Sequence, residues 1–205
     1  MKPILVLYAT KEGHTRRIAR QMAASIAAGG MTVDVHDVKS VPRFFGIDHY
    51  EAVILAASVH AGEHEAAMVS FVKARRDELR TLPTAFVSVS LAEAGAELPT
   101  ASASERAKAQ RDVRRMVFRF LDETGFSPSR VKPVAGALLY TQYNPVVRFV
   151  MKQIAGRSGG STDTAHDHVY TDWESLDQFV QEFVASLPDR ARAKSPAMPA
   201  VRLVG

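Results

Sequence analysis

The chain has 205 residues, of which 46% are hydrophobic and 23% are charged, and its formal net charge is +4. These values are ordinary for a globular domain and exclude a disordered chain, a collagen-like fibre and a coiled-coil rod. The chain contains no cysteine, which excludes a disulfide framework, a thiol nucleophile and a thiolate metal site. No stretch resembles a secretory signal or reaches the roughly 18 apolar residues of a membrane span. We therefore expect a protein that is soluble or attached to a membrane surface.

The positive charge is unevenly distributed along the chain. Residues 187–205 include four basic residues and one acidic residue, so this tail holds +3 of the net charge. The tail also has three prolines and no helical or strand period, which predicts that it is disordered. Two further basic stretches lie in 101–119 and after Tyr140. The simplest interpretation of each stretch is a solvated helix face.

Short apolar runs alternate with amphipathic segments. The runs predict strands over 3–8, 32–38, 52–57, 84–89 and 131–139. The amphipathic segments predict helices, the first ending at Gly29-Gly30 and the others covering 65–79, 104–124 and a stretch that begins at Thr171. Thr171 and Glu174 have the spacing of a capping box. This alternation predicts an α/β fold with a doubly wound, five-stranded parallel sheet and helices on both faces.

Ligands of such folds bind at the carboxyl ends of the strands, and the first loop at that end covers residues 9–16. Its candidate binding residues are Thr10, Lys11, Glu12, Gly13, His14 and Thr15. Two threonine hydroxyls, a glycine and backbone N–H groups at a helix N-terminus suit a phosphate. The loop lacks the G-x-G-x-x-G and G-K-[ST] motifs of dinucleotide and triphosphate sites. We therefore expect one phosphate; the alternative is a capped turn without a ligand.

The second loop follows the apolar run 52–57 and is made of small residues around a histidine. Its candidate residues are Ser58, Val59, His60, Ala61 and Gly62. Small residues let a flat ring approach the backbone closely, and His60 can hydrogen-bond such a ring or move protons near neutral pH. A surface histidine is the alternative for His60 and the preferred interpretation of His64. No carboxylate ligand pattern accompanies these two histidines, so we expect no metal.

Two later regions complete the candidate site. The first contains Ser88, Val89, Ser90 and Leu91, whose hydroxyls at a strand end can meet polar ring edges. The second is the connection of about 30 residues between Leu139 and Thr171, and connections of this length are usually functional or disordered. It contains a predicted amphipathic helix with Arg148 and Lys152 on one face and Arg157 at its end. Such a helix suits an anionic membrane surface or an apolar ligand, and the alternative is an extra helix packed on the core.

Several of these strings together resemble a known family. The string YATKEGHT resembles the phosphate loop of flavodoxin-type FMN proteins. The strings ASVHAGEHEAAMVSFVK, SVSLAEAG, VAGALLYTQYNPVVRFVMKQIAGRSGGSTDT and VYTDWE resemble the flavodoxin-like, menaquinone-dependent protoporphyrinogen IX dehydrogenases of bacterial heme synthesis. The resemblance runs from about residue 2 to residue 185. It implies a flavodoxin-like domain over 1–186 with an insertion at about 140–170.

The resemblance also implies a cofactor and a reaction. FMN would place its phosphate at 10–15 and its ring against 58–62, 88–91 and the region from Gly136 to Tyr140. The reaction would oxidise protoporphyrinogen IX with a menaquinone-type quinone. Arg148, Lys152 and Arg157 would attract porphyrin propionates or anionic lipid head groups. The expected location is cytoplasmic and peripheral on the inner face of the cell membrane.

Other interpretations remain open from the sequence. One is a flavodoxin electron carrier without its own small-molecule substrate, although such carriers are typically acidic and this chain is basic. Another is a flavin-free protein that binds membrane surfaces or nucleic acid through its charge. The basic residues show no aromatic ladder or nucleic-acid motif, so we expect no nucleic-acid partner. The sequence allows a homodimer without requiring one.

Overall fold

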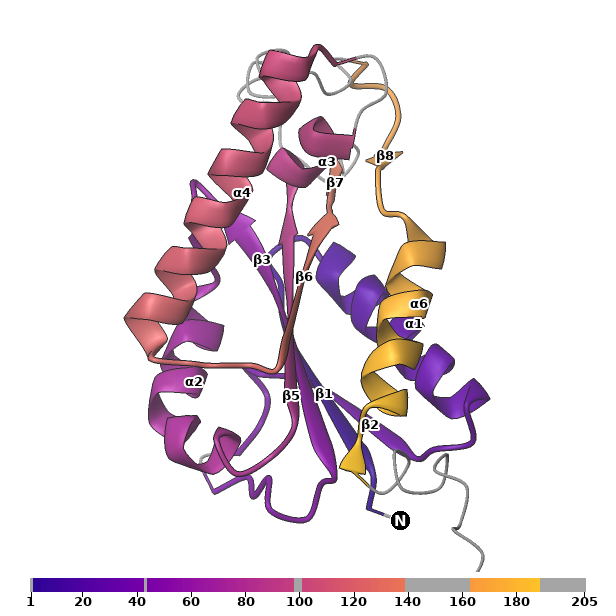
Figure 1. The fold of residues 1–205 in the computed structure, drawn as a ribbon, viewed down its shortest axis with the longest axis vertical. Helices are drawn as coiled ribbons and strands as arrows, with labels where there is room; N and C mark the ends of the chain where they lie inside the picture. The colour runs from indigo at the N-terminus through magenta and orange to yellow at the C-terminus, as the bar shows by residue number, and fades with distance from the viewer. Residues whose placement is uncertain (1, 43, 98–100, 139–162, 189–205) are drawn as a thin grey trace, which may run out of the picture.

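The computed structural model describes residues 2–42, 44–97, 101–138 and 163–188. Five parallel strands form its central sheet (Figure 1). In spatial order they are β2 (Val33–Asp37), β1 (Ile4–Ala9), β3 (Ala52–His60), β5 (Thr84–Ser90) and β6 (Arg130–Ala135). The order reverses direction at β1, as a doubly wound sheet requires. The predicted fold class is confirmed.

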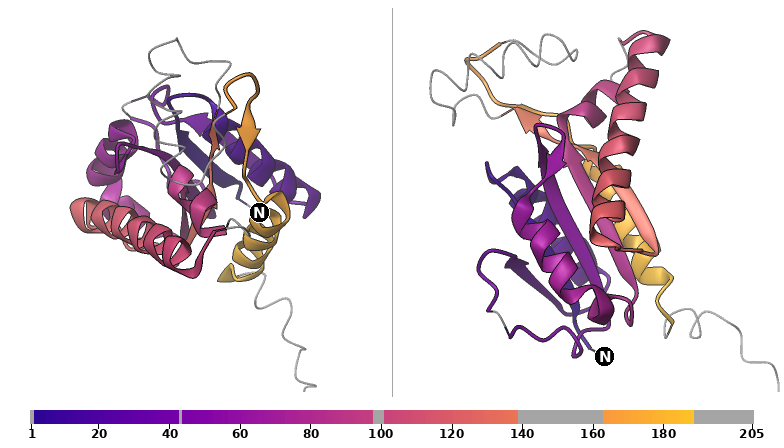
Figure 2. Two further views of the ribbon diagram at one scale, coloured as in Figure 1. Left: turned by 90° about the horizontal axis from the view of Figure 1, so that it is seen from above. Right: turned by 90° about the vertical axis from the view of Figure 1, so that its left-hand side faces the viewer.

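Helices cover both faces of the sheet, as the view from above shows (Figure 2). One face carries α1 (His14–Ala28) and α6 (Trp173–Ala185), and the other carries α2 (Ala66–Leu79) and α4 (Ala103–Thr124). Alternate residues of β1 enter the two cores, with Ile4 and Val6 on the α1 side and Leu5 and Leu7 on the α2 side. Both faces of β1 are therefore buried, which explains its continuous apolar run.

The last predicted strand, 131–139, is wrong as a single strand. β6 stays in register with β5 only as far as the pair Ala135–Ser90, because β5 ends there. Gly136 N still donates to Ser90 O at 3.0 Å, and the chain then leaves the sheet. The short strand β7 (Ala137–Leu138) pairs instead with β8 (His168–Val169) in an antiparallel, two-stranded sheet.

Two further short elements, besides β7 and β8, were not predicted. β4 (Glu63–His64) folds back antiparallel on the end of β3, and α3 (Leu91–Glu97) begins directly after β5. Two strand residues are too few to show an alternating pattern. In α3 the side chain of Ser90 accepts a hydrogen bond from Glu93 N, which helps to begin a helix that buries only Ala94.

The helix ends differ from the prediction at two places. α4 begins with a capping box between Ser102 and Glu105, which the sequence analysis did not identify. The capping box predicted at Thr171 is wrong: Asp172 is the N-cap of α6 and accepts from Ser175 N at 2.9 Å. The Thr171 hydroxyl is not available as a cap, because it donates to Ala135 O at 2.7 Å.

The folded part extends slightly beyond the predicted boundary at residue 186. Leu187, which the sequence analysis assigned to the disordered tail, is buried in the core against α6. Residues 189–205 and the predicted insertion helix lie outside the described residues. Within the described part of the chain, no helix has both the length and the apolarity needed to cross a membrane.

Candidate flavin site

A cavity of about 280 Å³ lies at the carboxyl ends of the central strands. Most of these strand ends point toward the top of Figure 1. Its volume is close to the lower end of the range typical for ligand pockets. The loops after β1, β3 and β5 and the turn after β6 all contribute to its wall. The lining residues are Thr10, Glu12, His14, Thr15, Ser58, Val59, His60, Ala61, Gly62, Val89, Ser90, Leu91, Ala92, Met116, Gly136 and Ala137.

The first loop turns sharply into the N-terminus of α1. Gly13 adopts a left-handed conformation with a φ of +88°, which glycine reaches without steric cost. Its N–H donates to Thr10 Oγ1 at 3.0 Å. The Thr15 hydroxyl is buried and has no hydrogen-bond partner in the described part of the chain. An unused hydroxyl at a helix N-terminus fits the oxygens of a phosphate group.

His14 ties this loop to the start of α6. Its Nε2 lies 2.8 Å from Thr171 Oγ1, and its ring lies 6.0 Å from the ring of Trp173. Burial, and to a smaller extent the charge of Arg17, lower the pKa of His14 to about 4. The residue that begins α1 is therefore neutral at pH 7 in this structure.

The second loop is a tight hairpin between β3 and β4. Ala61 and Gly62 have φ values of +51° and +84°, and His60 pairs with Glu63 across the turn. Two central residues with positive φ are the mark of a type I′ turn, whose twist matches that of the strands. The hairpin holds small residues and a histidine against the cavity.

His60 is surrounded by polar partners at the edge of the cavity. Its Nε2 lies 3.2 Å from Ser58 Oγ and 3.7 Å from Glu65 Oε1, and its Nδ1 lies 3.8 Å from Glu12 Oε1. Glu65 also forms an ion pair with Lys39 at 3.1 Å. His60 thus connects the first and second loops and has a carboxylate near each ring nitrogen.

His64 is buried, so the prediction that it is a surface histidine is wrong. Its Nε2 lies 2.9 Å from Ser88 Oγ, and its ring packs against the stacked rings of Phe86 and Phe120. Antiparallel pairing with Val59 turns the residue inward, toward β5. Ser88 faces this interior contact and does not line the cavity.

Comparison with known proteins adds to this geometry. The family profile described as "Flavodoxin domain" matches residues 5–165. A protein named protoporphyrinogen IX dehydrogenase [quinone] from Escherichia coli (strain K12) is 34% identical over 192 residues, which cover 93% of this chain and 98% of that protein. A protein of the same name from Leishmania major is 33% identical over 95% of this chain and 81% of its own length. The chain belongs to the protoporphyrinogen IX dehydrogenase family of flavodoxin-domain proteins.

A solved structure shows the fold that this family shares with flavodoxins. A short-chain flavodoxin associated with a non-canonical PDU bacterial microcompartment aligns with a TM-score of 0.50 and 12% identity. The alignment covers 91% of this chain and 99% of that one. The likeness supports the doubly wound sheet, and the flavodoxin domain supports a flavin cofactor.

The fold of this dehydrogenase family member places most of the predicted site residues around one cavity. The predicted residues that line the cavity are Thr10, Glu12, His14, Thr15, Ser58, Val59, His60, Ala61, Gly62, Val89, Ser90, Leu91 and Gly136. Lys11, Gly13 and Ser88 are described but do not line it. Tyr140, Arg148, Lys152 and Arg157 lie outside the described residues.

Two lining residues of this family member, Ala92 and Met116, were not predicted as part of the site. Ala137 lines the cavity within the predicted contact region from Gly136 to Tyr140. Met116 belongs to the predicted helix 104–124, and a helical pattern does not show which strand end a residue faces. Ala92 has no functional group that would mark it as a site residue in the sequence, since a small side chain only leaves space.

Proposed function

We propose that this protein is an FMN-dependent dehydrogenase that oxidises protoporphyrinogen IX to protoporphyrin IX in heme biosynthesis, with a quinone as electron acceptor. The observation that carries the proposal is the identity of 34% over nearly the full length of both chains to a relative with that name. The cavity formed by the loops after β1, β3 and β5 and the turn after β6 supports it independently. Because the conversion removes six hydrogens, three two-electron rounds and three quinones are needed.

The phosphate of FMN fits the start of α1. There the helix N-terminus, the unpartnered Thr15 hydroxyl and the Gly13 turn offer donors without a side-chain obstruction. The flavin ring fits between the β3–β4 hairpin and residues 89–91, where small side chains line the cavity. Lys11 lies in the same loop and can add positive charge near the phosphate.

The protein's own part in the reaction is to bind, to orient and to handle protons. Bound FMN supplies the chemistry, since a flavin takes up a hydride equivalent and passes electrons on. His60 reaches the cavity with Glu12 and Glu65 within 4 Å of its ring nitrogens. It can hold a proton at either nitrogen and exchange it with these carboxylates. We assign His60 to local proton transfer.

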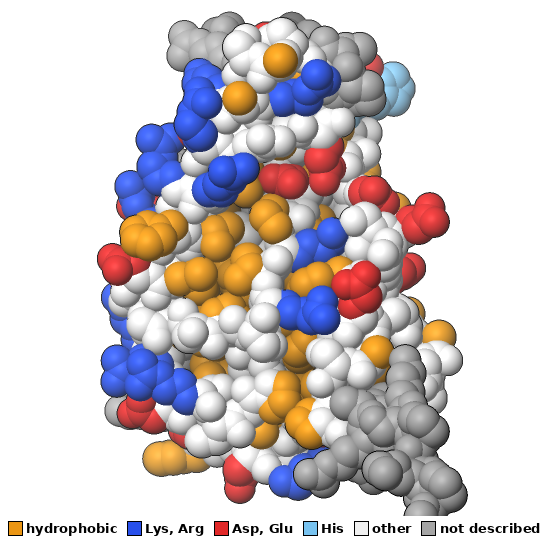
Figure 3. Space-filling model, viewed as in Figure 1, with side chains coloured by type: hydrophobic (Ala, Val, Ile, Leu, Met, Phe, Trp, Pro, Cys, Tyr) orange, Lys and Arg blue, Asp and Glu red, His pale blue; other side chains and the backbone are white. Residues whose placement is uncertain are grey.

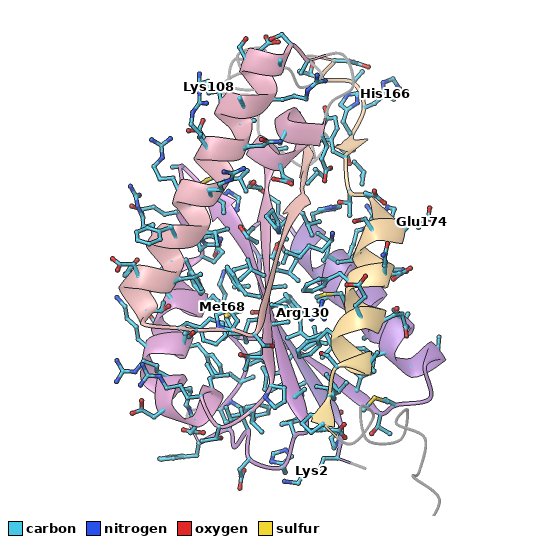
Figure 4. All side chains as sticks on the ribbon, viewed as in Figure 1. Lys2, Met68, Lys108, Arg130, His166 and Glu174 are labelled. Carbon is cyan, nitrogen blue, oxygen red and sulfur yellow. The ribbon has the colours of Figure 1, made fainter. Side chains whose placement is uncertain are left out.

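Peripheral attachment to the inner face of the cell membrane is part of the proposal. The outward face of α4 carries Arg111, Arg114, Arg115 and the exposed Phe118, whose spacing places them on one side of the helix. Lys and Arg side chains gather along α4 in Figure 3, and Lys108 projects away from the sheet in Figure 4. This basic α4 face suits anionic lipids, to which each charge contributes about 1 kcal/mol. Arg148, Lys152 and Arg157 would add to it.

The decisive experiment follows the redox state of the bound flavin. Protoporphyrinogen IX is added anaerobically to the FMN-loaded protein, and a menaquinone analogue is added afterwards. The expected result is loss and then recovery of the oxidised flavin absorbance, with protoporphyrin fluorescence appearing in the first step. A flavin that stays oxidised with the porphyrinogen contradicts the enzyme and favours the electron carrier. A chain that binds no FMN contradicts both.

Two further parts of the proposal have their own measurements. Comparing menaquinone and ubiquinone analogues as reoxidants tests the menaquinone-type acceptor, for which faster reoxidation by the menaquinone analogue is expected. Light scattering on the FMN-loaded protein tests the homodimer that the sequence allows.

A further inference from the structure

A chain of two hydrogen bonds fixes where His14 carries its proton. Thr171 Oγ1 lies 2.7 Å from Ala135 O and 2.8 Å from His14 Nε2. A carbonyl oxygen can only accept, so the single proton of the threonine hydroxyl is donated to Ala135. The hydroxyl oxygen can then only accept from His14. The imidazole is therefore protonated at Nε2, and in its neutral form Nδ1 has a lone pair and no proton.

That Nδ1 atom is buried and has no hydrogen-bond partner among the described residues. The neighbouring Thr15 Oγ1 is also buried and also lacks a hydrogen-bond partner among the described residues. Both residues stand at the beginning of α1, both line the cavity, and their exposed fractions are 6% and 1%. A buried polar atom without a partner costs free energy. Two such atoms on consecutive residues that line a cavity indicate that a bound group supplies their missing hydrogen-bond partners.

The charged groups around His14 do not supply a partner. Arg17 on the same helix only disfavours the protonated ring. Glu12 in the loop lies instead near His60 Nδ1. Asp172 at the start of α6 accepts from Ser175 N, and Lys132 on β6 donates to Ser175 Oγ. In the flavin-free chain the imidazole consequently stays neutral near pH 7.

We propose that His14 is a ligand of the FMN phosphate and that it takes up a proton at Nδ1 when the phosphate binds. The inference rests on the proposed FMN cofactor and adds a proton-linked residue to its site. A phosphate dianion offers only acceptors, so an unprotonated Nδ1 beside it would be repulsive. A proton at Nδ1 turns the lone pair into a donor, and the phosphate charge stabilises the imidazolium against burial.

Thr171 determines which nitrogen responds. Because Nε2 is already donating to Thr171, the added proton can enter only at Nδ1. The ring can then donate from both nitrogens at once, toward Thr171 on one side and toward the phosphate on the other. The imidazole need not rotate, so its contact with Trp173 is kept.

The first test uses the wild-type full-length chain and needs no variant to fold. Nitrogen-15 NMR of the histidine rings is recorded at pH 6.5 before and after addition of FMN. We expect His14 to change from the neutral Nε2–H tautomer to the imidazolium. A ring that stays in the neutral tautomer while FMN is bound overturns the proposal. Riboflavin, which lacks the phosphate, is expected to leave the ring neutral.

The second test measures proton uptake by calorimetry in buffers of different ionisation enthalpy. His14→Gln keeps an N–H that can donate to Thr171 but cannot gain a charge. We expect the wild type to take up about half a proton or more beyond this variant on binding FMN at pH 6. The ratio of wild-type to variant affinity should fall about tenfold or more from pH 5 to pH 8. Comparing the two proteins cancels the ionisation of the phosphate itself.

Equal proton uptake and a constant affinity ratio would overturn the role of His14. That outcome leaves the proposed reaction untouched, because FMN would still be bound and could still be reduced by protoporphyrinogen IX. Conversely, a bound flavin that the porphyrinogen fails to reduce removes the proposed reaction and leaves the proton-linked site in place. A chain that binds no FMN contradicts both proposals.

Discussion

His64 Nε2 lies 2.9 Å from Ser88 Oγ in the interior on the α2 and α4 side of the sheet. The rings of Phe86 and Phe120, stacked on each other at 4.3 Å, lie 5.3 and 4.9 Å from the imidazole. This contact anchors β4, and through it the hairpin that carries His60, to the middle of the sheet. Burial lowers the pKa of His64 from 6.5 to about 4.

This contact makes the stability of the flavin-free protein depend on pH. Between pH 6.5 and pH 4 the unfolded chain binds a proton at His64 that the folded chain does not, so the free energy of unfolding falls as pH falls. The contribution at neutral pH is about 3 kcal/mol. Urea unfolding of His64→Gln should therefore show a smaller loss between pH 7 and pH 4 than the wild type. His49→Gln, at an exposed histidine, should leave the loss unchanged.

The type I′ turn predicts opposite responses at two adjacent residues. Gly62→Ala places a Cβ in open space but in a left-handed conformation, so it should destabilise the protein by about 1–2 kcal/mol. Ala61→Gly removes such strain and adds unfolded-state entropy, so its net effect should stay within about 1 kcal/mol of zero. Thermal unfolding of the two variants checks the difference. Equal destabilisation by both substitutions would contradict the turn geometry.

Thr171 joins three elements through one hydroxyl. Thr171→Val leaves Ala135 O and His14 Nε2 without this buried partner, and we expect a loss of about 1–3 kcal/mol in the free energy of unfolding. Thr81→Val removes an exposed hydroxyl that also donates to a backbone carbonyl. It should cost much less, and denaturant unfolding compares the two. A similar small loss in both would show that the Thr171 contact is not buried in solution.

The basic α4 face predicts binding to anionic vesicles. Arg111→Glu with Arg114→Glu should weaken sedimentation with phosphatidylserine-containing liposomes at least about tenfold, and high salt should reduce the difference. The charge-matched control is Arg75→Glu on α2 with Arg80→Glu at the C-cap of that helix. FMN affinity should be the same in all three proteins. If the control weakens binding as much, the effect comes from net charge and the α4 face is not the contact.

The basic residues of the connection 140–170 predict a separate contribution. Arg148→Glu with Lys152→Glu should weaken binding to the same liposomes while FMN affinity stays unchanged. Unchanged vesicle binding would assign the contact to α4 alone. Loss of FMN affinity in this variant would instead connect these two residues with the flavin cavity.

The parallel sheet and its covering helices could be predicted because burial on both faces leaves a simple mark in the sequence. The strands β1, β3 and β5 are mainly apolar and buried along most of their length, and strand ends in such sheets converge on one edge. That rule alone predicted most of the residues that line the cavity, although they come from four separate stretches of the chain. The two-residue strands β4, β7 and β8 were missed because a period cannot be read from two positions.

The details of the site depend on contacts between distant residues. Whether His64 is exposed depends on Ser88, which is 24 residues away, and on two aromatic rings from different elements. Whether Thr171 caps a helix depends on Ala135, which is 36 residues away. Local spacing favours the capping box, but the Thr171 hydroxyl donates its hydrogen bond to the distant carbonyl of Ala135 instead. Sequence patterns indicate local preference, and they do not show which distant group a side chain will contact in the folded protein.

β7 and β8 pair with each other and so hold the two ends of the segment that connects them. Leu138 pairs with His168, and Tyr170 N donates to Gly136 O, so the two ends of the intervening segment are held together by the domain itself. The entropic cost of closing a loop grows only slowly with its length. Here the β7–β8 pairing already holds the two loop ends together. A change in the length of the segment between the two strands therefore adds little entropic cost, because the β7–β8 pairs hold its ends.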